Sequence, residues 1–251
     1  MSYIIQKGAL FIDDEEFLGH EIIEEIGKGA NGVVFLATNK TLKRPEALKI
    51  WLKQRDNDSR DKLKQGLLEA QKLANVKGDY AIQIFGAQQV GNVLVATMAY
   101  FDGQTLRDFI VEKSQLQVCK VLRIYLEAIE ETTVPKSFHG DAHDKNVLVR
   151  INTESQDNRI ELKLCDFGTS IFNGKEDSFK RHWKIVNETI KKCTKGMRGY
   201  DEAQKKLEYD RLQLNKQQSE MAKEIKFGSI ETYDSRLFTA VYKDYFEYLE
   251  F

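Results

Sequence analysis

The spacing of apolar residues changes near residues 99–103, and this change restricts the fold more than any other feature of the sequence. Before it, short apolar or alternating runs lie between turn residues, as in β-strands. After it, apolar residues recur every three or four positions, as in helices. We therefore expect an α+β chain with a sheet-rich part at residues 1–98, a linker at residues 99–103 and a mainly helical part at residues 104–251.

The first part contains five runs that predict strands and one that predicts a helix. The strands fall at residues 20–26, 33–38, 46–51, 82–90 and 93–98. The helix extends over residues 56–76 and is capped by Asp56, Asp58 or Ser59. Its apolar positions, spaced by three and four, are Leu63, Leu67, Ala70, Leu73 and Ala74. This pattern predicts a five-stranded antiparallel sheet with one helix.

The second part begins with a short helix at residues 106–111, where Thr105 is placed as the N-cap. A longer helix at residues 116–133 ends before Pro135 and is the expected core helix. Its apolar face consists of Val118, Val121, Leu122, Tyr125 and Ile129.

Two strands and three helices complete the predicted pattern. The strands at residues 147–151 and 160–165 form a hairpin that presents Asn146 and Asp166 at neighbouring ends. The helices are expected at residues 178–194, 200–225 and 232–249, the second with a single buried stripe. We expect the aromatic residues of the last helix, among them Tyr233, Tyr242, Tyr245, Phe246 and Tyr248, to pack onto the core.

Composition excludes several classes of protein. A net charge of -1 across 251 residues gives no basic field, so nucleic acid is not an expected partner. Three cysteines, far apart and odd in number, form neither a disulfide framework nor a zinc cluster, which favours a reducing, cytoplasmic location. The N-terminal residues do not resemble a signal peptide, and no run approaches the ~20 apolar residues of a membrane span.

Gly27, Gly29 and Gly32, with Val34 beyond them, lie between two predicted strands. A dinucleotide-binding fingerprint would lead from a strand into a helix, so that class of site is rejected. Glycines allow backbone amides to approach polyphosphate oxygens, and a hairpin tip can close over them. The alternative is an ordinary glycine turn.

Lys49 places an ammonium group within an otherwise apolar strand, where burial is costly unless an anion meets it. Glu69, twenty residues later on the predicted helix, can supply that anion, and phosphates can supply another. The alternatives are an outward-facing lysine and an exposed helix glutamate.

Residues 139–146 form a polar loop before the strand predicted at residues 147–151, and Asp166-Phe167-Gly168 follows the next strand. Asp141 is suited to receive a hydroxyl proton, while Asn146 and Asp166 offer oxygen ligands to magnesium. We expect His139 to be structural and His143 to approach a γ-phosphate. The alternative, a pair of turn-capping aspartates, leaves Lys49 and the glycine turn as coincidences.

In this order, the five motifs resemble the protein-kinase-like superfamily: a glycine-rich loop, a strand lysine, a helix glutamate, a histidine-x-aspartate loop with a following asparagine, and an Asp-Phe-Gly turn. The resemblance implies a bilobal fold with an ATP-binding lobe and a helical catalytic lobe, with ATP and Mg²⁺ as cofactors. It implies that Lys49 contacts the α- and β-phosphates and pairs with Glu69, and that Asp141 is the catalytic aspartate. It also implies a set of groups around the adenine: Val34, Ala47, Met98, Leu148 and the backbone of Ala99 and Phe101.

The sequence departs from protein kinases at the catalytic loop. Gly140 stands where many have arginine, and His143 stands where they commonly have lysine, so the loop looks like that of aminoglycoside and choline phosphotransferases. Gly140 removes the cation that would anchor a phosphorylated activation loop, so no such phosphorylation should be required. No Ala-Pro-Glu follows Gly168, and only 83 residues remain (251 minus 168), which puts the peptide-binding shelf in doubt.

The sequence therefore predicts an ATP-dependent phosphotransferase that acts on protein serine or threonine, because its sheet-lobe motifs and Asp-Phe-Gly-Thr resemble protein kinases. A small-molecule hydroxyl acceptor is the alternative favoured by Gly140 and His143. A nucleotide-binding pseudokinase is a third reading, opposed by the complete set of catalytic residues. The sequence gives no indication of the oligomeric state.

Overall fold

The computed structural model describes residues 3–12, 15–29, 32–51, 59–76, 78–91, 93–133, 139–153, 159–167, 176–224 and 239–249. Several features of the sequence-based prediction lie outside these ranges: the caps Asp56 and Asp58, Pro135, Gly168 and most of the start of the last helix. The chain divides into two compact units. One comprises Met1–Asp102 with Asp166–Ile171, and the other comprises Gly103–Cys165 with Phe172–Phe251.

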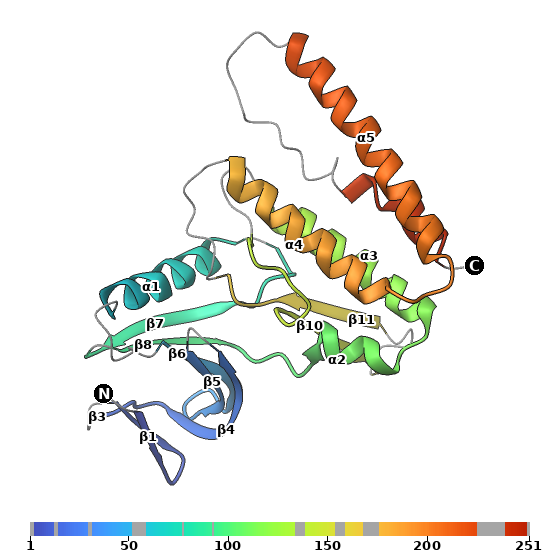
Figure 1. Ribbon diagram of the computed structural model, residues 1–251. Coiled ribbons are helices and arrows are strands. Elements are labelled where there is room, and N and C mark those ends of the chain that lie inside the picture. Colours follow the sequence, from blue (N-terminus) through green and yellow to red (C-terminus); the bar gives the residue numbers. More distant parts are fainter. Residues whose placement is uncertain are drawn as a thin grey trace. The chain divides into compact units, whose positions relative to one another are not determined.

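The first unit contains the predicted five-stranded antiparallel sheet, in the order β4-β5-β6-β8-β7 (Figure 1). Its strands are β4 (His20–Gly29), β5 (Gly32–Asn39), β6 (Arg44–Trp51), β7 (Ile84–Val90) and β8 (Val93–Ala99). Helix α1 (Ser59–Asn75) contacts β6, β7 and β8. The predicted fold class of this part is confirmed.

The predicted buried face of α1 is partly wrong, because Leu67 and Ala74 are exposed. Among the residues of α1 whose burial the structure describes, the buried ones are Gly66, Glu69, Ala70 and Leu73, which also follow a spacing of three and four. The predicted core position Leu63 lies outside these residues. The helix is therefore rotated so that a carboxylate lies within its buried face. The apolar period alone could not predict this rotation, because a charged residue is buried only where a partner receives it.

A three-stranded meander at the N-terminus was not predicted. It consists of β1 (Tyr3–Gln6), β2 (Ala9–Ile12) and β3 (Glu15–Glu16). Lys7 and Gly8 connect β1 to β2 with φ angles of 50° and 79°, as a two-residue hairpin turn of the primed type requires. The meander belongs to the first unit.

The meander shares a hydrophobic core with the five-stranded sheet. This core consists of Leu10, Ile12, Phe17, Ile22, Val33, Phe35, Ala37, Leu48, Ile50, Val93 and Val95. Leu48 and Ile50 alternate along β6 with Lys49 and Trp51, and successive strand side chains point to opposite faces. The meander therefore covers the face of the sheet opposite to the face that carries Lys49 and Trp51.

The second unit contains the predicted helices and a small sheet in the order β11-β10-β9. Helix α2 (Leu106–Phe109) is capped by Thr105 as predicted, and a 3₁₀ turn (Ile110–Glu112) follows it. Helix α3 (Gln115–Thr132) buries its entire predicted apolar face. Strands β10 (Val147–Asn152) and β11 (Arg159–Leu164) form the predicted hairpin, to which β9 (Gln104–Thr105) adds a short third strand.

The C-terminal helices are α4 (Glu176–Thr194), α5 (Tyr200–Glu224) and α7 (Lys243–Glu247). On α5, Ala203 and Leu207 are fully buried while Tyr209 and Leu212 are exposed, which confirms a single buried stripe over this part of the helix. Of the last predicted helix, at residues 232–249, the structure describes residues 239–249. Within these, α7 covers only Lys243–Glu247, so the helix is shorter there than predicted.

Three of the C-terminal aromatic residues pack into the core of the second unit, as predicted, while Tyr233 lies outside the described residues. Tyr242, Tyr245 and Phe246 are buried, whereas Tyr248 is half exposed. The Tyr245 hydroxyl lies 2.6 Å from Thr194 Oγ1 and accepts from Gln204 Nε2 at 2.8 Å. This short segment thus joins α4 to α5.

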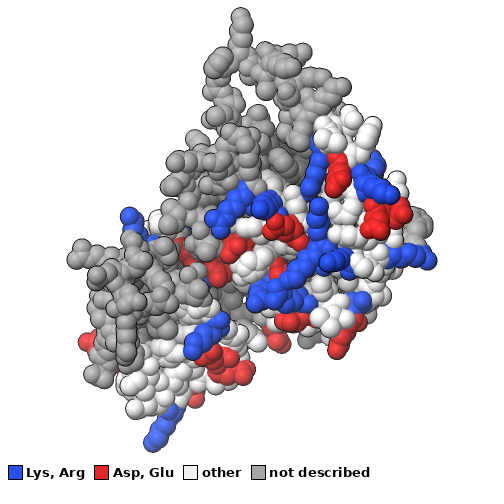
Figure 2. Space-filling view, viewed as in Figure 1, with Lys and Arg blue, Asp and Glu red and all other residues white. Residues whose placement is uncertain are grey.

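Charged side chains of both signs lie next to one another on the face shown in Figure 2, in keeping with the net charge of -1. Within the part of the chain that the structure describes, no helix is long and apolar enough to cross a membrane.

Candidate active site

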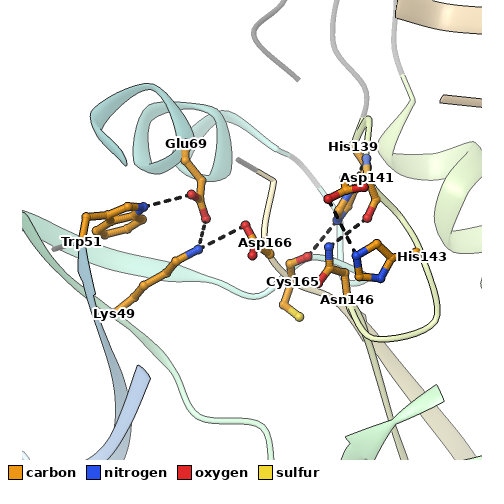
Figure 3. A network of polar contacts seen from close by, with 9 residues as sticks. All are labelled: Lys49, Trp51, Glu69, His139, Asp141, His143, Asn146, Cys165 and Asp166. Carbon is orange, nitrogen blue, oxygen red and sulfur yellow. Dashed lines mark hydrogen bonds and ion pairs between the residues drawn. The ribbon is translucent and has the colours of Figure 1, made fainter. Parts of the chain in front are cut away.

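Lys49 lies in a buried ionic cluster of the first unit (Figure 3). Its ammonium nitrogen Nζ is 2.5 Å from Glu69 Oε1 and 3.2 Å from Asp166 Oδ1. Lys49 and Glu69 are 7% and 5% exposed, so neither charge has water as its main partner. The structure thus brings together Lys49, Glu69 and Asp166, which lie far apart in the sequence.

The ionisation of this cluster depends on burial. Burial raises the pKa of Glu69 to about 7; Lys49 opposes this shift and the nearby Asp166 adds to it. Burial alone would lower the pKa of Lys49, but the two carboxylates outweigh it and raise that pKa. Near neutral pH, therefore, Glu69 is the member of the pair whose charge changes.

The catalytic-loop histidine His139 is fully buried in the second unit. Its Nδ1 accepts a hydrogen bond from the Asp141 backbone N–H at 3.2 Å, and its Nε2 lies 2.9 Å from the carbonyl oxygen of Cys165. A single neutral tautomer, with the proton on Nε2, satisfies both contacts. His139 therefore connects the backbone of Asp141 to the residue that precedes Asp166, in the structural role predicted for it.

Asp141, His143 and Asn146 are close together in the same loop (Figure 3). Asn146 Nδ2 donates to the Asp141 carbonyl oxygen at 2.9 Å. His143 Nδ1 accepts from the Lys145 N–H at 3.2 Å, and its Nε2 lies 3.8 Å from Asp141 Oδ2. The Asp141 carboxylate remains partly exposed, with 22% of its side-chain surface accessible, so a hydroxyl group can approach it.

Three elements hold this loop from outside. Tyr125 of α3 donates its hydroxyl to the Ala142 carbonyl at 2.5 Å. Arg107 of α2 forms two hydrogen bonds with the Asp144 carboxylate, at 2.9 and 3.1 Å, and Lys192 of α4 pairs with the same carboxylate. Burial opposes the ionisation of Asp144, but these partners outweigh it and lower its pKa.

A histidine of α4 supports the turn at Gly140. The Gly140 N–H donates to His182 Nδ1 at 3.3 Å, and Thr133 Oγ1 lies 3.5 Å from His182 Nε2. Burial, with His139 nearby, lowers the pKa of His182 to about 3, so the ring is neutral and its Nδ1 can accept. Gly140 has a φ of 83°, a conformation that favours glycine.

The glycine-rich segment lies at the facing ends of two paired strands, as predicted, and the turn predicted at residues 30–31 lies outside the described residues. Gly27 and Gly29 lie on β4, and Gly29 pairs with Gly32 at the start of β5. A side chain at Gly32 would collide with the Ile50 carbonyl oxygen of the neighbouring strand. Close approach between strands therefore requires glycine at this position.

The residues expected around adenine lie in both units. Ala47 and Met98 are paired across β6 and β8 and are buried, while Val34 is half-buried on β5. The Ala99 N–H already donates to the Gln83 carbonyl at 2.8 Å, so Ala99 can offer a purine only its carbonyl oxygen. Phe101 is buried, and Leu148 is half-buried on β10 of the second unit.

The side chains expected to hold Mg²⁺ have suitable chemistry. The Asn146 amide nitrogen is used by the Asp141 carbonyl, which directs the amide oxygen elsewhere. The Asp166 side chain is 35% exposed and its backbone has a φ of 59°. Among the described residues, no group of three or more histidine, cysteine or acidic side chains could hold a metal ion. One or two protein side chains would be enough for Mg²⁺, because this ion commonly takes its remaining ligands from substrate phosphates and water.

Four residues of the site were missed by sequence reasoning: Trp51, Arg107, His182 and Lys192. Each contacts a predicted site residue or its loop from a distant part of the chain. No local pattern marks them, although a tryptophan two residues after a buried lysine was a usable signal for Trp51.

The model of the protein kinase domain matches residues 20–192, more than half of the 251 residues. The chain belongs to the protein kinase family. The match covers every motif on which the resemblance rested, from the glycine-rich hairpin to the segment containing Asp166. The predicted superfamily is confirmed.

Several curated relatives are named as serine/threonine protein kinases. A probable kinase of this type from Dictyostelium discoideum is 28% identical over 66% of this chain and 34% of its own length. A probable kinase from Arabidopsis thaliana is 29% identical over 66% of this chain and 15% of its own. Serine/threonine-protein kinase 10 of Mus musculus is 28% identical over 63% and 16%. The chain thus matches about a third or less of the length of each of these relatives.

A solved structure supports the fold. The crystal structure of a double mutant of the PknI kinase domain of Mycobacterium tuberculosis has a TM-score of 0.54, covering 75% of this chain and 75% of its own, at 17% identity. At that identity the likeness concerns the fold alone, and it confirms the predicted bilobal α+β class.

Proposed function

We propose that this kinase domain transfers the γ-phosphate of ATP to serine or threonine hydroxyls of proteins. The observation that carries the proposal is the buried cluster of Lys49, Glu69 and Asp166. Burying the charges of Lys49 and Glu69 costs stability, and such pairs are found preferentially at functional sites, where a polyphosphate is an anion that the lysine can bind. The serine/threonine kinases among the relatives support a protein acceptor.

Each predicted site residue has a role in this proposal. Lys49 contacts the α- and β-phosphates, while backbone amides near Gly27, Gly29 and Gly32 approach the phosphate oxygens. Val34, Ala47, Met98 and Leu148 contact adenine, and the Ala99 carbonyl and Phe101 backbone bind its polar edge. Asn146 and Asp166 would hold Mg²⁺, which when bound neutralises charge on the phosphates.

Asp141 receives the proton in the transfer step. The acceptor oxygen forms a bond to the γ-phosphorus, the bond from that phosphorus to the bridging oxygen breaks, and ADP leaves. The hydroxyl proton passes to the Asp141 carboxylate, which His139 and Asn146 position through the backbone. Its partial exposure allows a hydroxyl to approach.

His143 gives a second candidate function specific support. Its Nε2 is 3.8 Å from the Asp141 carboxylate, where it can contact a transferring phosphate. Together with Gly140, this residue is the part of the loop that looks like small-molecule phosphotransferases. The acceptor would then be a metabolite hydroxyl, and the roles of Lys49 and Asp141 would be unchanged.

The test is transfer of labelled γ-phosphate from ATP with Mg²⁺ to a panel of proteins and peptides and, separately, to a panel of hydroxylated metabolites. The variants are Asp141→Asn and Asp166→Ala, with Asp201→Asn on the exposed surface of α5 as the matched control. Labelled phosphoserine or phosphothreonine that disappears in both site variants, but not in the control, is the expected result.

Other outcomes reject this proposal. Labelled metabolites without labelled protein would support the second function. ATP binding without transfer to either panel would identify a pseudokinase.

A further inference from the structure

Trp51 contacts both members of the Lys49–Glu69 pair (Figure 3). It follows Lys49 by two residues on β6, so both side chains point to the same face of the strand. Its indole Nε1 donates to Glu69 Oε2 at 3.2 Å, and the Lys49 ammonium lies 5.0 Å from the centre of its ring. Only 4% of Trp51 is exposed.

The indole completes the environment of a carboxylate that has little access to water. Lys49 donates to Oε1 of Glu69 and Trp51 donates to Oε2, so each oxygen has a donor of its own. Two donors at fixed positions define the orientation of the carboxylate, whereas a single flexible lysine would not. Removing the donor of a buried acceptor destabilises the folded protein. For a buried carboxylate, the same loss also raises the pKa.

The ring of Trp51 also determines how closely α1 approaches the sheet. A side chain at Gly66 would place its Cβ 2.8 Å from Trp51 Cγ, so the ring occupies the space beside the helix backbone. Gly66 and Glu69 are three residues apart and therefore lie on the same face of α1. One side chain of β6 thus touches the helix at two successive points.

We propose that Trp51 is a positioning residue for Lys49: its ring seats α1 against β6 through Gly66, and its indole N–H orients Glu69 to receive the lysine. The inference rests on the proposed role of Lys49 in ATP binding. A tryptophan that merely fills the core would need the ring but not the N–H. This difference makes the proposal testable.

The first experiment compares Trp51→Phe with Trp183→Phe, the same change at the other buried tryptophan of the chain. Phenylalanine retains an aromatic ring beside Gly66 and Lys49 but lacks the donor. We expect Trp51→Phe to weaken ATP binding about tenfold, as the loss of a hydrogen bond to a charged group does, with an unchanged KM for the acceptor. Trp183→Phe should leave ATP affinity unchanged.

A pH profile separates positioning from simple packing. The hydrogen bond from Trp51 opposes the burial that raises the pKa of Glu69, so its removal raises that pKa further. ATP binding weakens when Glu69 is protonated, because Lys49 loses the nearer of its two anionic partners. The acidic limb of ATP affinity should therefore move to higher pH by about one unit in Trp51→Phe, and should not move in Trp183→Phe.

Fluorescence provides a readout that does not require phosphate transfer. The chain has two tryptophans, so Trp183→Phe leaves Trp51 as the sole indole. We expect its emission to change with pH as Glu69 ionises, and this change to disappear when Glu69→Gln is added. ATP titration and the Trp51 emission can both be measured without phosphate transfer. They therefore test the role of Trp51 even if no acceptor is labelled, and the two failures can be told apart.

The proposal would be overturned if Trp51→Phe bound ATP with the wild-type affinity and pH profile. It would also be overturned if the emission of Trp51 were the same with and without Glu69→Gln. If Trp51→Phe fails to fold, the fluorescence comparison decides alone, because both of its proteins retain Trp51.

Discussion

The predicted site residues fall into two regions, one in each unit, and the two regions are held in place by different physical means. In the first unit, Lys49 is fixed by the buried carboxylate of Glu69, the partly exposed carboxylate of Asp166 and an indole. In the second, Asp141 is fixed mainly through its backbone, by a neutral histidine and an asparagine amide. A buried group such as the Lys49 ammonium keeps its charge only with charged partners. A partly exposed group such as the Asp141 carboxylate is hydrated, so neutral hydrogen bonds to its backbone are enough to position it.

The two regions also differ in their dependence on pH. The pKa of Glu69 is raised to about 7, so in the folded state its carboxyl group keeps a proton to higher pH than in the unfolded chain. His182, which supports the catalytic loop, has a lowered pKa and sheds its proton on folding. The predictions below test this contrast, beginning with the largest effect.

Asp141→Asn should lower kcat by about 10²- to 10⁴-fold, because it removes the group that we propose receives the hydroxyl proton. The backbone contacts to His139 and Asn146 remain, so the thermal unfolding temperature should change little. Rates measured with saturating ATP, together with thermal melts, check both statements. A loss of activity matched by a collapse of the fold would show that the loop depends on the carboxylate itself.

Lys49→Met should destabilise the first unit, because it leaves Glu69 buried without its cation. The loss should be about 3–5 kcal/mol at pH 8, and smaller at pH 6, where Glu69 can bind a proton instead. Denaturant unfolding at the two pH values measures the difference. Adding Glu69→Leu should recover part of the loss, and failure to recover would mean that the pair is not the source of the stability.

His182 should make the folded state less stable in acid. Its pKa is about 3 when folded and near its ordinary value of 6.5 when unfolded, so between these values the unfolded chain binds the extra proton. Stability attributable to His182 is therefore complete above pH 6.5 and is lost as the pH falls toward 3, by up to about 1.4 kcal/mol per pH unit. Unfolding measured from pH 7 to pH 5 should show a shallower slope in His182→Gln than in the wild type.

Gly140→Ala should cost about 1–2 kcal/mol, because alanine is strained at a φ of 83°. The strain lies beside Asp141, so kcat should fall more than the KM for ATP rises. Gly196→Ala, also at a positive φ but distant in sequence and with open space around the added methyl group, is the matched control for strain. Equal kinetic effects in the two variants would contradict a specific role for the Gly140 turn.

Phosphatase treatment should have the smallest effect. With Gly140 in place of a cation before Asp141, there is no arginine at this position to bind a phosphorylated activation loop. The specific activity should be the same before and after treatment, with removal of phosphate verified by mass spectrometry. Lost activity that returns on rephosphorylation would refute this prediction.

Much of the fold could be predicted because it depends on local spacing. Alternation predicted the strands of the five-stranded sheet, and a spacing of three and four predicted the core face of α3. Thr105 was recognisable as a cap from its position alone. The N-terminal meander was missed because its strands are short, and because its apolar residues become a core only against strands of another sheet.

The sequence by itself determined that a lysine would stand within an apolar strand, that a carboxylate would follow on a helix, and that a polar loop would precede a hairpin. These features depend on residue type and on spacing within single elements. Only the tertiary structure decided that α1 turns Glu69 inward and leaves Leu67 exposed, that Trp51 meets Glu69, and that His182 supports Gly140. Those contacts join residues 18 and 42 positions apart, and they depend on how helices rotate and approach one another, which no local period specifies.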